Sequence, residues 1–339
     1  MLQTPLDPAS ALAALCETHG RALTLNHLVQ AGLDQLPAPG SGQTLERWQR
    51  LAEVAAHDLP LVKFFEGHTD ALAIQTELGA RVPPPASLWG TWCAEPPQAR
   101  LQFRADGEQC RLHGIKAWCS GAQAVTHAVV SGWNEAGEPC LATVVLDAPG
   151  VRITDEGWAA VGMAATRSVD VHFDGAQGQW LGRPGDYVRR PGFWQGGAGI
   201  AACWWGGAAG IANLAVPRIR GRDDAHALAH LGAMDIALRS TGALLREAAA
   251  WIDAHPQQSA QTWALRARLA VEQAAEEVLR SAGRALGAGP LCRDARFAQA
   301  MADLPVFLRQ SHAERDLAAL GAQCGAPGAQ AATTAEWRL

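Results

Sequence analysis

The residues best suited to chemistry lie in the stretch LHGIKAWCSGAQAVTHAVV, from Leu112 to Val130, which reads as two β-strands around a polar and aromatic centre. That centre, residues 116–121, holds an indole at Trp118 and a hydroxyl at Ser120. An indole offers a flat face and a hydroxyl offers a hydrogen bond, so the pair is suited to holding a flat ligand. A plainer interpretation stays open, in which Trp118 is a core aromatic and Ser120 a turn residue before Gly121.

Other candidate groups carry weaker signals. Glu66 and His68 in KFFEGH form a candidate acid–base pair, but residues two apart on a helix point in different directions. The adjacent Asp223 and Asp224, and the charges around His312 in RQSHAERDLAAL, are typical of solvated surfaces. The eight cysteines are scattered and form no CxxC pair, which argues against a zinc cluster or a disulfide scaffold. We therefore expect reduced thiols and no metal.

Composition narrows the class of protein. A chain of 339 residues that is 48% hydrophobic and 18% charged can bury a large core, as a soluble globular protein does. Its net charge of -5 comes with no basic block, so we expect no nucleic-acid footprint and no polybasic membrane patch. The N-terminal stretch MLQTPLDPASALAAL lacks the basic and apolar regions of a secretory signal. These features predict a cytoplasmic protein.

The uncharged stretch QGGAGIAACWWGGAAGIANLAV, at 195–216, is long enough to span a bilayer. Because Gly and Ala dominate it, we expect a helix buried among other helices and no membrane span. Gly197, Gly199 and Ala202 in this stretch resemble a dinucleotide-binding fingerprint. That motif requires a buried strand before it, and RRPGFWQ is not one, so the fingerprint interpretation is disfavoured.

The helices and strands that must position these residues can be predicted from the spacing of apolar residues and from the turn residues along the chain. Residues 1–85 show apolar positions at helical spacing, and VPPPAS at 82–87 is typical of a linker. Residues 86–190 hold short β-branched runs closed by Gly, Asp, Asn or Pro, which predict an antiparallel barrel or sandwich. Residues 191–339 hold four long helical stretches, near 195–217, 224–255, 259–287 and 293–320. The predicted fold class is α+β and multi-domain, with N-terminal helices, a central β-domain and a C-terminal four-helix bundle.

Five patches, in this order along the chain, resemble motifs of the acyl-CoA dehydrogenase superfamily of flavoproteins. They are Thr91–Pro96 (TWCAEP), Leu112–Gly121 (LHGIKAWCSG), Gly162–Ser168 (GMAATRS) followed by Val171–Asp174, Ala233–Met234 inside HLGAMDIALRST, and Arg293–Arg296 (RDAR). The resemblance covers the chain from about Leu51 to Leu320. It implies the same order of helices, β-domain and bundle.

The resemblance also implies a cofactor, FAD, and residues that hold it. It places Trp118 beside the isoalloxazine ring and the hydroxyl of Ser120 near N5 as a donor, with Cys119 between them. Backbone contacts to the ring edge fall on Thr91, Cys93 and Ala94. Of the arginines that replace the family's R-x-x-F-G segment (Arg218, Arg220 and Arg222), Arg222 is the candidate cofactor contact.

The catalytic base of the family is not found at its usual position. That position, nine residues after Arg293, falls on Ala302, and the neighbouring Asp303 is the candidate base. An N-cap or surface role for Asp303 stays open. The family's coenzyme A motif is replaced by Pro97–Arg100, the arginine that opens its bundle is lost, and its adenine-side loop is reduced to RALGAGP. These departures predict a remodelled pocket.

The prediction for function is therefore an FAD-dependent oxidoreductase that dehydrogenates an unusual acyl thioester, or a related small molecule, between its α and β carbons. Its electrons would pass to a partner protein or to oxygen. Two alternatives stay open: a flavin-dependent monooxygenase that uses reduced flavin and oxygen, and a non-catalytic, degenerate subunit. The resemblance also implies a homodimer or a homotetramer.

Overall fold

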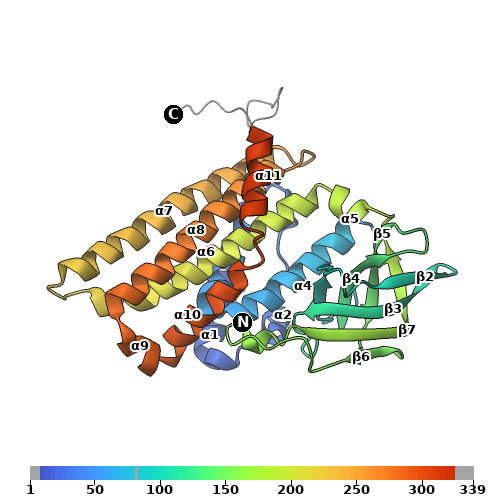
Figure 1. The fold of residues 1–339 in the computed structure, drawn as a ribbon, viewed down its shortest axis with the longest axis horizontal. Coiled ribbons are helices and arrows are strands. Elements are labelled where there is room, and N and C mark those ends of the chain that lie inside the picture. The colour runs from blue at the N-terminus through green and yellow to red at the C-terminus, as the bar shows by residue number, and fades with distance from the viewer. Residues whose placement is uncertain (1–7, 81–82, 325–339) are drawn as a thin grey trace, which may run out of the picture. The chain divides into compact units, whose positions relative to one another are not determined.

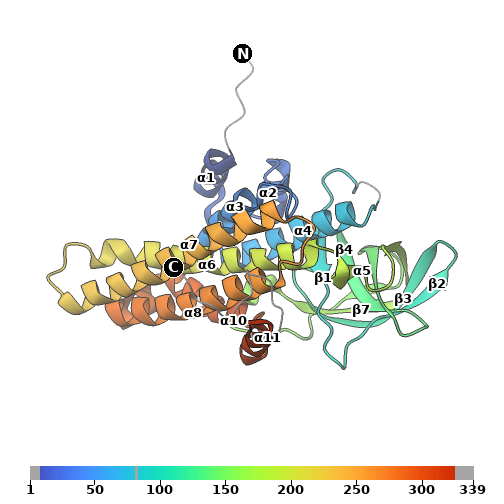
Figure 2. The same cartoon turned by 90° about the horizontal axis from the view of Figure 1, so that it is seen from above.

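The computed structural model describes residues 8–80 and 83–324, in which helices are followed by strands and then by helices again (Figures 1 and 2). This is the predicted α+β order. The chain groups into two compact units, which we call the barrel unit (residues up to Leu36 with Pro60–Phe193) and the bundle unit (Pro37–Leu59 with the chain from Trp194 onward). The domain boundaries expected near residues 85 and 190 stay predictions, and Arg81 and Val82, before or within the expected linker, lie outside the described residues.

The helices of the barrel unit are α1 (Pro8–His19), α2 (Leu25–Gln30), nearly all of α4 (Leu59–Glu77) and the short α5 (Asp186–Arg189). Helix α4 matters most for the site. Its residues Ala71 and Ile74 join Trp89, Val129 and Leu141 in one buried apolar cluster. Burial of this cluster fixes α4 against the strands.

Seven strands make the sheet: β1 (Trp89–Trp92), β2 (Gln102–Asp106), β3 (Gln109–Cys119), β4 (His127–Trp133), β5 (Pro139–Val145), β6 (Val151–Ile153) and β7 (Val169–Leu181). The pairings β4–β2–β3–β7–β5–β4 return to their starting strand, so the sheet closes into a barrel. The expectation of a purely antiparallel domain is wrong in one respect, because β1 pairs with β4 in parallel and Gln102 of β2 pairs with Trp133 in parallel.

Strands β3 and β7 form the longest antiparallel pair, and their register is interrupted near the end of β3. Lys116 lies opposite Val171, while Cys119 lies opposite Val169, so three steps on β3 match two on β7. Such a bulge bends a strand and redirects its side chains. It lies at Ala117 and Trp118, inside the segment that the sequence singles out.

The bundle unit contains α3 (Thr44–His57), α6 (Gly192–Ile219), α7 (Ala225–Ala254), α8 (Gln261–Leu286), α9 (Ala288–Arg293), α10 (Ala295–Leu308) and α11 (Glu314–Cys324). The fourth long helix, expected over 293–320, is divided. Asp294 caps the start of α10 by accepting the backbone N–H groups of Arg296 and Phe297. A left-handed Ala313, with φ of 46°, then separates α10 from α11.

Helix α6 contains the uncharged stretch, and 72% of its most apolar window is buried. It is the one helix in the described part of the chain whose length and composition would allow a membrane span. A Cβ on Gly206 would lie 2.3 Å from the carbonyl oxygen of Ala52, and one on Gly210 would lie 2.7 Å from that of Ala56. The glycines therefore let α6 pack directly on the backbone of α3, which favours the core-helix interpretation.

Candidate functional site

The end of β3 exposes an aromatic side chain on a strained backbone. Trp118 has a φ of 58°, and its indole is 52% exposed. Left-handed backbone costs a non-glycine residue about 1–2 kcal/mol. The next thiol, Cys119, is fully buried and donates to the carbonyl of Lys116 at 3.1 Å, and burial raises the pKa of this thiol. Cys119 therefore offers no exposed atom at the surface, and its expected cofactor contact stays a prediction.

A second strained segment packs on this turn. Residues Ala164–Thr166 form a single 3₁₀ turn whose flanking residues, Met163 and Arg167, are both left-handed. The backbone N–H of Gly121 donates to the carbonyl of Thr166 at 2.9 Å, which joins the two segments. Non-glycine residues in this region of φ and ψ cluster at functional sites, and here two segments that carry such residues meet.

Three hydroxyls connect the two segments. The Oγ of Ser120 lies 2.8 Å from the Oγ of Ser168, which lies 2.9 Å from the Oγ1 of Thr166. Thr166 donates its own proton to the carbonyl oxygen of Met163 at 2.8 Å. Ser168 and Thr166 are buried, whereas Ser120 is half-buried at the surface. Ser120 is therefore the outer end of a chain that runs into the barrel unit.

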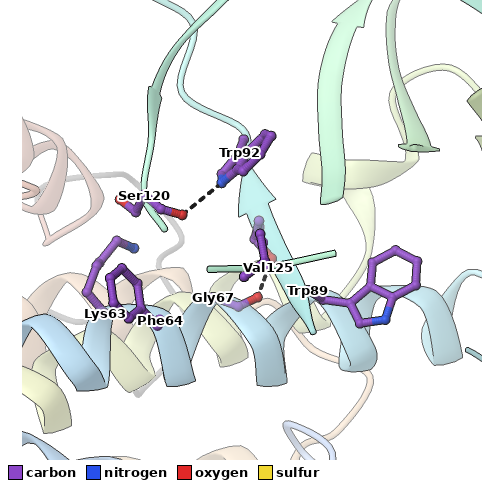
Figure 3. Close-up of a pocket in the computed structure, with 9 residues that line it drawn as sticks. Lys63, Phe64, Gly67, Trp89, Trp92, Ser120 and Val125 are labelled. Atoms are coloured by element: carbon purple, nitrogen blue, oxygen red, sulfur yellow. Dashed lines mark hydrogen bonds between the residues drawn. The ribbon is translucent and has the colours of Figure 1, made fainter. Parts of the chain in front are cut away.

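A small pocket, partly open to solvent, lies beside Ser120. Its lining comes from α4, from β1 and from the segment after β3: Lys63, Phe64, Gly67, Trp89, Gly90, Thr91, Trp92, Ser120 and Val125. Figure 3 shows the indole nitrogen of Trp92 directed at Ser120, whose carbonyl it meets at 3.1 Å. The hydroxyl of Thr91 donates to the carbonyl of Gly67 at 2.7 Å, which holds β1 against α4. These bonds give the pocket fixed walls.

A buried polar cluster lies on the same strand, four residues before Ser120. Lys116 is fully buried, and its ammonium donates to the carbonyl and the hydroxyl of Ser131, both at 2.8 Å. The Glu95 carboxylate lies 3.6 Å from the ammonium and accepts from the Ser131 hydroxyl and the Trp133 indole. Burial lowers the pKa of Lys116, and the neighbouring Cys93 and Glu95 partly oppose this shift. The cluster ties β3 to β4 and to the loop after β1.

The other predicted contacts on β1 are placed near this cluster. Cys93 is half-buried, and burial raises the pKa of its thiol, while Lys116 opposes that shift. Burial raises the pKa of Tyr187 well above its ordinary value, and the neighbouring Cys93 adds to this shift. Ala94 is exposed just after β1. Thr91 and Ser120 thus share the pocket lining, whereas Cys93 and Ala94 are outside that lining.

The predicted base lies in the bundle unit. Asp303 is 2% exposed within α10, and its Oδ1 accepts from the side-chain amide of Gln299 at 2.8 Å. The alternative that Asp303 is an N-cap or surface carboxylate is wrong, because α10 continues through Pro305 and buries this face. Arg222 is exposed in the loop after α6. Asp224 caps α7, and the backbone N–H of Ala227 is the main cause of the lowered pKa of its carboxyl.

Glu66 and His68 do not form an acid–base pair with each other. His68 is 1% exposed; its Nδ1 accepts from the backbone N–H of Trp89 at 3.1 Å, and its Nε2 lies 3.3 Å from a carboxylate oxygen of Asp34. Glu66 pairs with Lys63 at 2.8 Å, and burial raises the pKa of the Glu66 carboxyl despite this partner. His68 therefore fastens α4 to the start of β1, which supports the pocket wall.

The residues around the pocket fit a flavin ring. Large aromatic side chains are normally buried, yet Trp118 is half exposed. It is outside the pocket lining but lies two residues before Ser120, which is part of that aromatic lining. A flat aromatic ligand would cover the indole of Trp118. Among the described strands, β1 pairs only with β4, so its other backbone edge is left for contacts to a ring edge. The cofactor contacts expected at residues 91–94 and 118–120 stay predictions.

No protein-family model matches the chain, and no curated protein matches it. Several solved structures do match the chain. Dibenzothiophene monooxygenase TdsC from Paenibacillus sp. A11-2 has a TM-score of 0.79 at 17% identity, over 93% of this chain and 96% of that chain. Methanesulfinate monooxygenase MsuC from Pseudomonas fluorescens has a TM-score of 0.79 at 20% identity, over 95% and 96% of the two chains.

A third structure, of KijD3 with FMN and a dTDP-linked amino sugar, has a TM-score of 0.77 at 20% identity and covers 95% of each chain. TdsC has also been solved with FMN and indole. These proteins are flavin enzymes of the acyl-CoA dehydrogenase-like fold. The fold expected from the five sequence patches is therefore confirmed over nearly the whole chain.

Sequence reasoning missed Ser168, Thr166 and Lys63 as parts of the site. Ser168 and Thr166 belong to GMAATRS, which the sequence marks as a motif without indicating which of its side chains matter. Nothing in the sequence brings them to Ser120, because 48 residues separate Ser120 from Ser168. Lys63 lies in KFFEGH, the segment in which Glu66 and His68 are the candidate acid–base pair.

Proposed function

We propose that this chain is a flavin-dependent oxidoreductase whose ring site is the pocket beside Ser120. The observation that carries the proposal is Trp118, a half-exposed indole held on left-handed backbone at the end of β3. Such strain persists only where the surrounding structure maintains it, and that is typical of a binding site. The fold shared with flavin enzymes supports the same conclusion.

Each residue of the site has a role in this proposal. Trp118 stacks on the ring, Ser120 meets N5, and the backbone of residues 91–94 meets the opposite ring edge. Phe64, Trp92 and Val125 exclude water from the reacting side of the pocket. When bound, flavin supplies two-electron transfer and, in its reduced form, reaction with oxygen. Arg222 remains a proposed contact to a longer cofactor such as FAD.

The finer function that we favour is a monooxygenase that receives reduced FMN from a reductase. TdsC and MsuC, which share the fold, are monooxygenases, and TdsC and KijD3 have been solved with FMN. Within the described lining of the pocket, the one ionisable side chain is Lys63, and its ammonium pairs with Glu66. A monooxygenase does not need the carboxylate base that proton abstraction from an acyl thioester requires.

A second candidate is the dehydrogenation of an unusual acyl thioester with Asp303 as base. The observation in its favour is a carboxylate buried on a helix, a setting in which enzymes often keep a base. Against it, one oxygen of that carboxylate already accepts a hydrogen bond from Gln299. Replacement of Asp303 by Asn should lower dehydrogenation by roughly 10²-fold or more if Asp303 is the base. It should leave oxygen-dependent turnover nearly unchanged.

The test begins with binding. Purified protein is titrated with FMN and with FAD, each oxidised and, without oxygen, reduced. We expect Trp118→Ala to weaken binding by about tenfold, because stacking on an aromatic contributes about 1–3 kcal/mol. Trp180→Phe is the matched control, since Trp180 packs on Phe103 within the same barrel unit and is not in the pocket lining. Failure to bind any flavin would refute the proposal.

Turnover then separates the two candidates. With a flavin reductase and NADH, an oxygen-dependent hydroxylated or cleaved product supports the monooxygenase. An α,β-unsaturated thioester formed from a panel of acyl thioesters, with a dye as electron acceptor, supports the dehydrogenase. Flavin binding without either product supports the degenerate-subunit alternative.

We also propose a homodimer or homotetramer, formed through α7, in the cytoplasm. Leu228 and Ile236 lie eight residues apart on α7 with exposures of 49% and 70%, which supports an interface there. All eight cysteines are free thiols, which fits a reducing compartment. Sedimentation of wild type and of Ile236→Glu tests the assembly, because a buried charge should shift the protein toward monomer.

A further inference from the structure

The hydroxyl chain behind Ser120 has a fixed direction. The carbonyl oxygen of Met163 can only accept. Its contact with the Thr166 hydroxyl, at 2.8 Å, is shorter than its contacts with the Thr166 backbone N–H and the Trp158 indole N–H, so we assign the hydroxyl proton of Thr166 to it. Thr166 can then take part in its contact with Ser168 only as an acceptor, and Ser168 must donate. Ser168 has no second proton, so its contact with Ser120 requires Ser120 to donate.

The direction has a consequence at the pocket. Because the Ser120 proton points inward at Ser168, the Ser120 oxygen has only its lone pairs to offer a ligand. The site therefore presents a hydrogen-bond acceptor at this point, although a serine is ordinarily able to donate. A ligand that places an N–H there is favoured, and one that places a lone pair there is disfavoured.

Flavin changes its hydrogen-bonding character at one such atom. N5 of the oxidised ring has a lone pair and no hydrogen, whereas N5 of the reduced ring carries a hydrogen. We propose that Ser168 and Thr166 are positioning residues that fix the Ser120 hydroxyl as an acceptor, so that the pocket binds reduced flavin in preference to oxidised flavin. This inference rests on the proposed function, in which Ser120 meets N5 of a bound flavin.

The surroundings keep the chain from reversing. Thr166 is 1% exposed and Ser168 is 3% exposed, so bulk water does not offer them other partners. The bond from the Gly121 N–H to the Thr166 carbonyl holds the two segments in register. The backbone N–H of Thr166, at 3.0 Å, and the indole N–H of Trp158, at 3.2 Å, also donate to the Met163 carbonyl and hold this final acceptor in place. The discrimination is built from residues that do not line the pocket.

The test substitutes Thr166, because this residue sets the direction of the hydroxyl hydrogen bonds and does not line the pocket. Thr166→Val keeps the shape of the side chain and removes the hydroxyl. Ser168 then has only Ser120 as a hydroxyl partner and can donate to it, which frees the Ser120 proton for the ligand. We expect the ratio of the dissociation constants of oxidised and reduced FMN to fall by about tenfold, as one hydrogen bond changes partner type. For a two-electron couple, that corresponds to a bound-flavin potential about 30 mV more negative.

Two control variants separate the effect of a reversed hydrogen-bond direction from the effect of a loosened barrel unit. Thr166→Ser keeps the hydroxyl and should keep the wild-type ratio. Thr154→Val removes another buried hydroxyl of the barrel unit, which donates to the carbonyl of Asp170 at 2.6 Å, and should also keep it. Dissociation constants come from anaerobic titrations of each redox state, and the potential comes from equilibration with a reference dye.

Each outcome decides the inference. The inference is supported if the ratio of the dissociation constants of oxidised and reduced FMN falls in Thr166→Val and stays unchanged in the two control variants. An equal change of both dissociation constants, or no change, overturns it and indicates that Ser120 meets an N–H present in both redox states. A lowered ratio in Thr154→Val as well overturns it by showing that any loosening of the barrel has this effect. Absence of flavin binding in wild type overturns the proposed function, and this inference with it.

Discussion

Strand β3 and the residue that follows it carry two polar groups, four residues apart, that differ in burial: one is enclosed in the protein and the other lies at the surface. Lys116 lies inside the barrel unit with its ammonium bonded to Ser131 and close to Glu95. Ser120 lies at the surface beside a strained, half-exposed Trp118. The comparison shows that one strand can fasten the barrel at one point and present a ligand site at the next. The bulge between Lys116 and Cys119 makes the change possible.

The two regions differ in how their energetic costs are met. Burial of the Lys116 ammonium is costly, but hydrogen bonds and a nearby carboxylate offset the cost within the protein. The left-handed backbone at Trp118 costs about 1–2 kcal/mol and gains no hydrogen bond for its side chain within the described residues. A bound ring would supply the missing contact. The first region therefore stabilises the barrel unit, and the second is the proposed binding site.

The largest effect should come from Lys116→Met, which removes the ammonium and keeps most of the side-chain volume. We expect the free energy of unfolding to fall by about 3 kcal/mol, since Glu95 and the carbonyl of Ser131 lose their cationic partner. Urea unfolding measures the loss. Adding Glu95→Gln should recover part of it, because the two residues are coupled. A loss below about 1 kcal/mol would mean that the cluster is not what fastens the barrel.

An intermediate effect is expected from a pair of variants at Trp118. Trp118→Gly and Trp118→Ala should weaken flavin binding equally, by about tenfold. The glycine variant should nevertheless be the more stable of the two by about 1 kcal/mol, because glycine tolerates positive φ. Thermal unfolding of both variants measures the difference. At Ala117, whose φ is not positive, Ala→Gly should instead destabilise the protein by about 0.5–1 kcal/mol.

The smallest effect concerns pH and the buried beginning of β3. Burial raises the pKa of Cys110 from 9.0 to about 12, with a minor contribution from Cys140. Above pH 9 the unfolded chain ionises this thiol while the folded chain does not, so the contribution of Cys110 to stability is lost as pH rises toward 12. Between about pH 8 and pH 10, wild type should lose roughly 1 kcal/mol more than Cys110→Ala.

Urea unfolding at the two pH values measures that difference, and the contributions of Lys116 and the other titrating groups cancel between the two proteins. A loss of the same size in both proteins would contradict the buried state of Cys110. Trp118→Ala should show the pH dependence of wild type, because the exposed end of β3 carries no titrating side chain between Trp118 and Gly121 other than Cys119.

Parts of the site follow from the sequence because their signals are local. The run from Leu112 to Gly121 predicts a strand with an aromatic and a hydroxyl at its end, and the structure has both there. Lys116 could not be predicted as buried, since lysine is ordinarily a surface residue and its partners Glu95 and Ser131 are distant in sequence. An N-cap or surface role was open for Asp303, but α10 continues through Pro305 and packing buries this side chain.

The sequence by itself determined the order of the elements, the fold and the identity of the strand that ends in Trp118 and Ser120. Hydrophobic periodicity and turn residues act over a few positions, and a single chain shows them directly. Only the tertiary structure decided that β1 runs parallel to β4, that Lys116 is enclosed, and that Thr166 and Ser168 orient the Ser120 hydroxyl. Hydrogen-bond direction depends on which groups meet in space, and residues that are 48 positions apart meet only when the barrel closes.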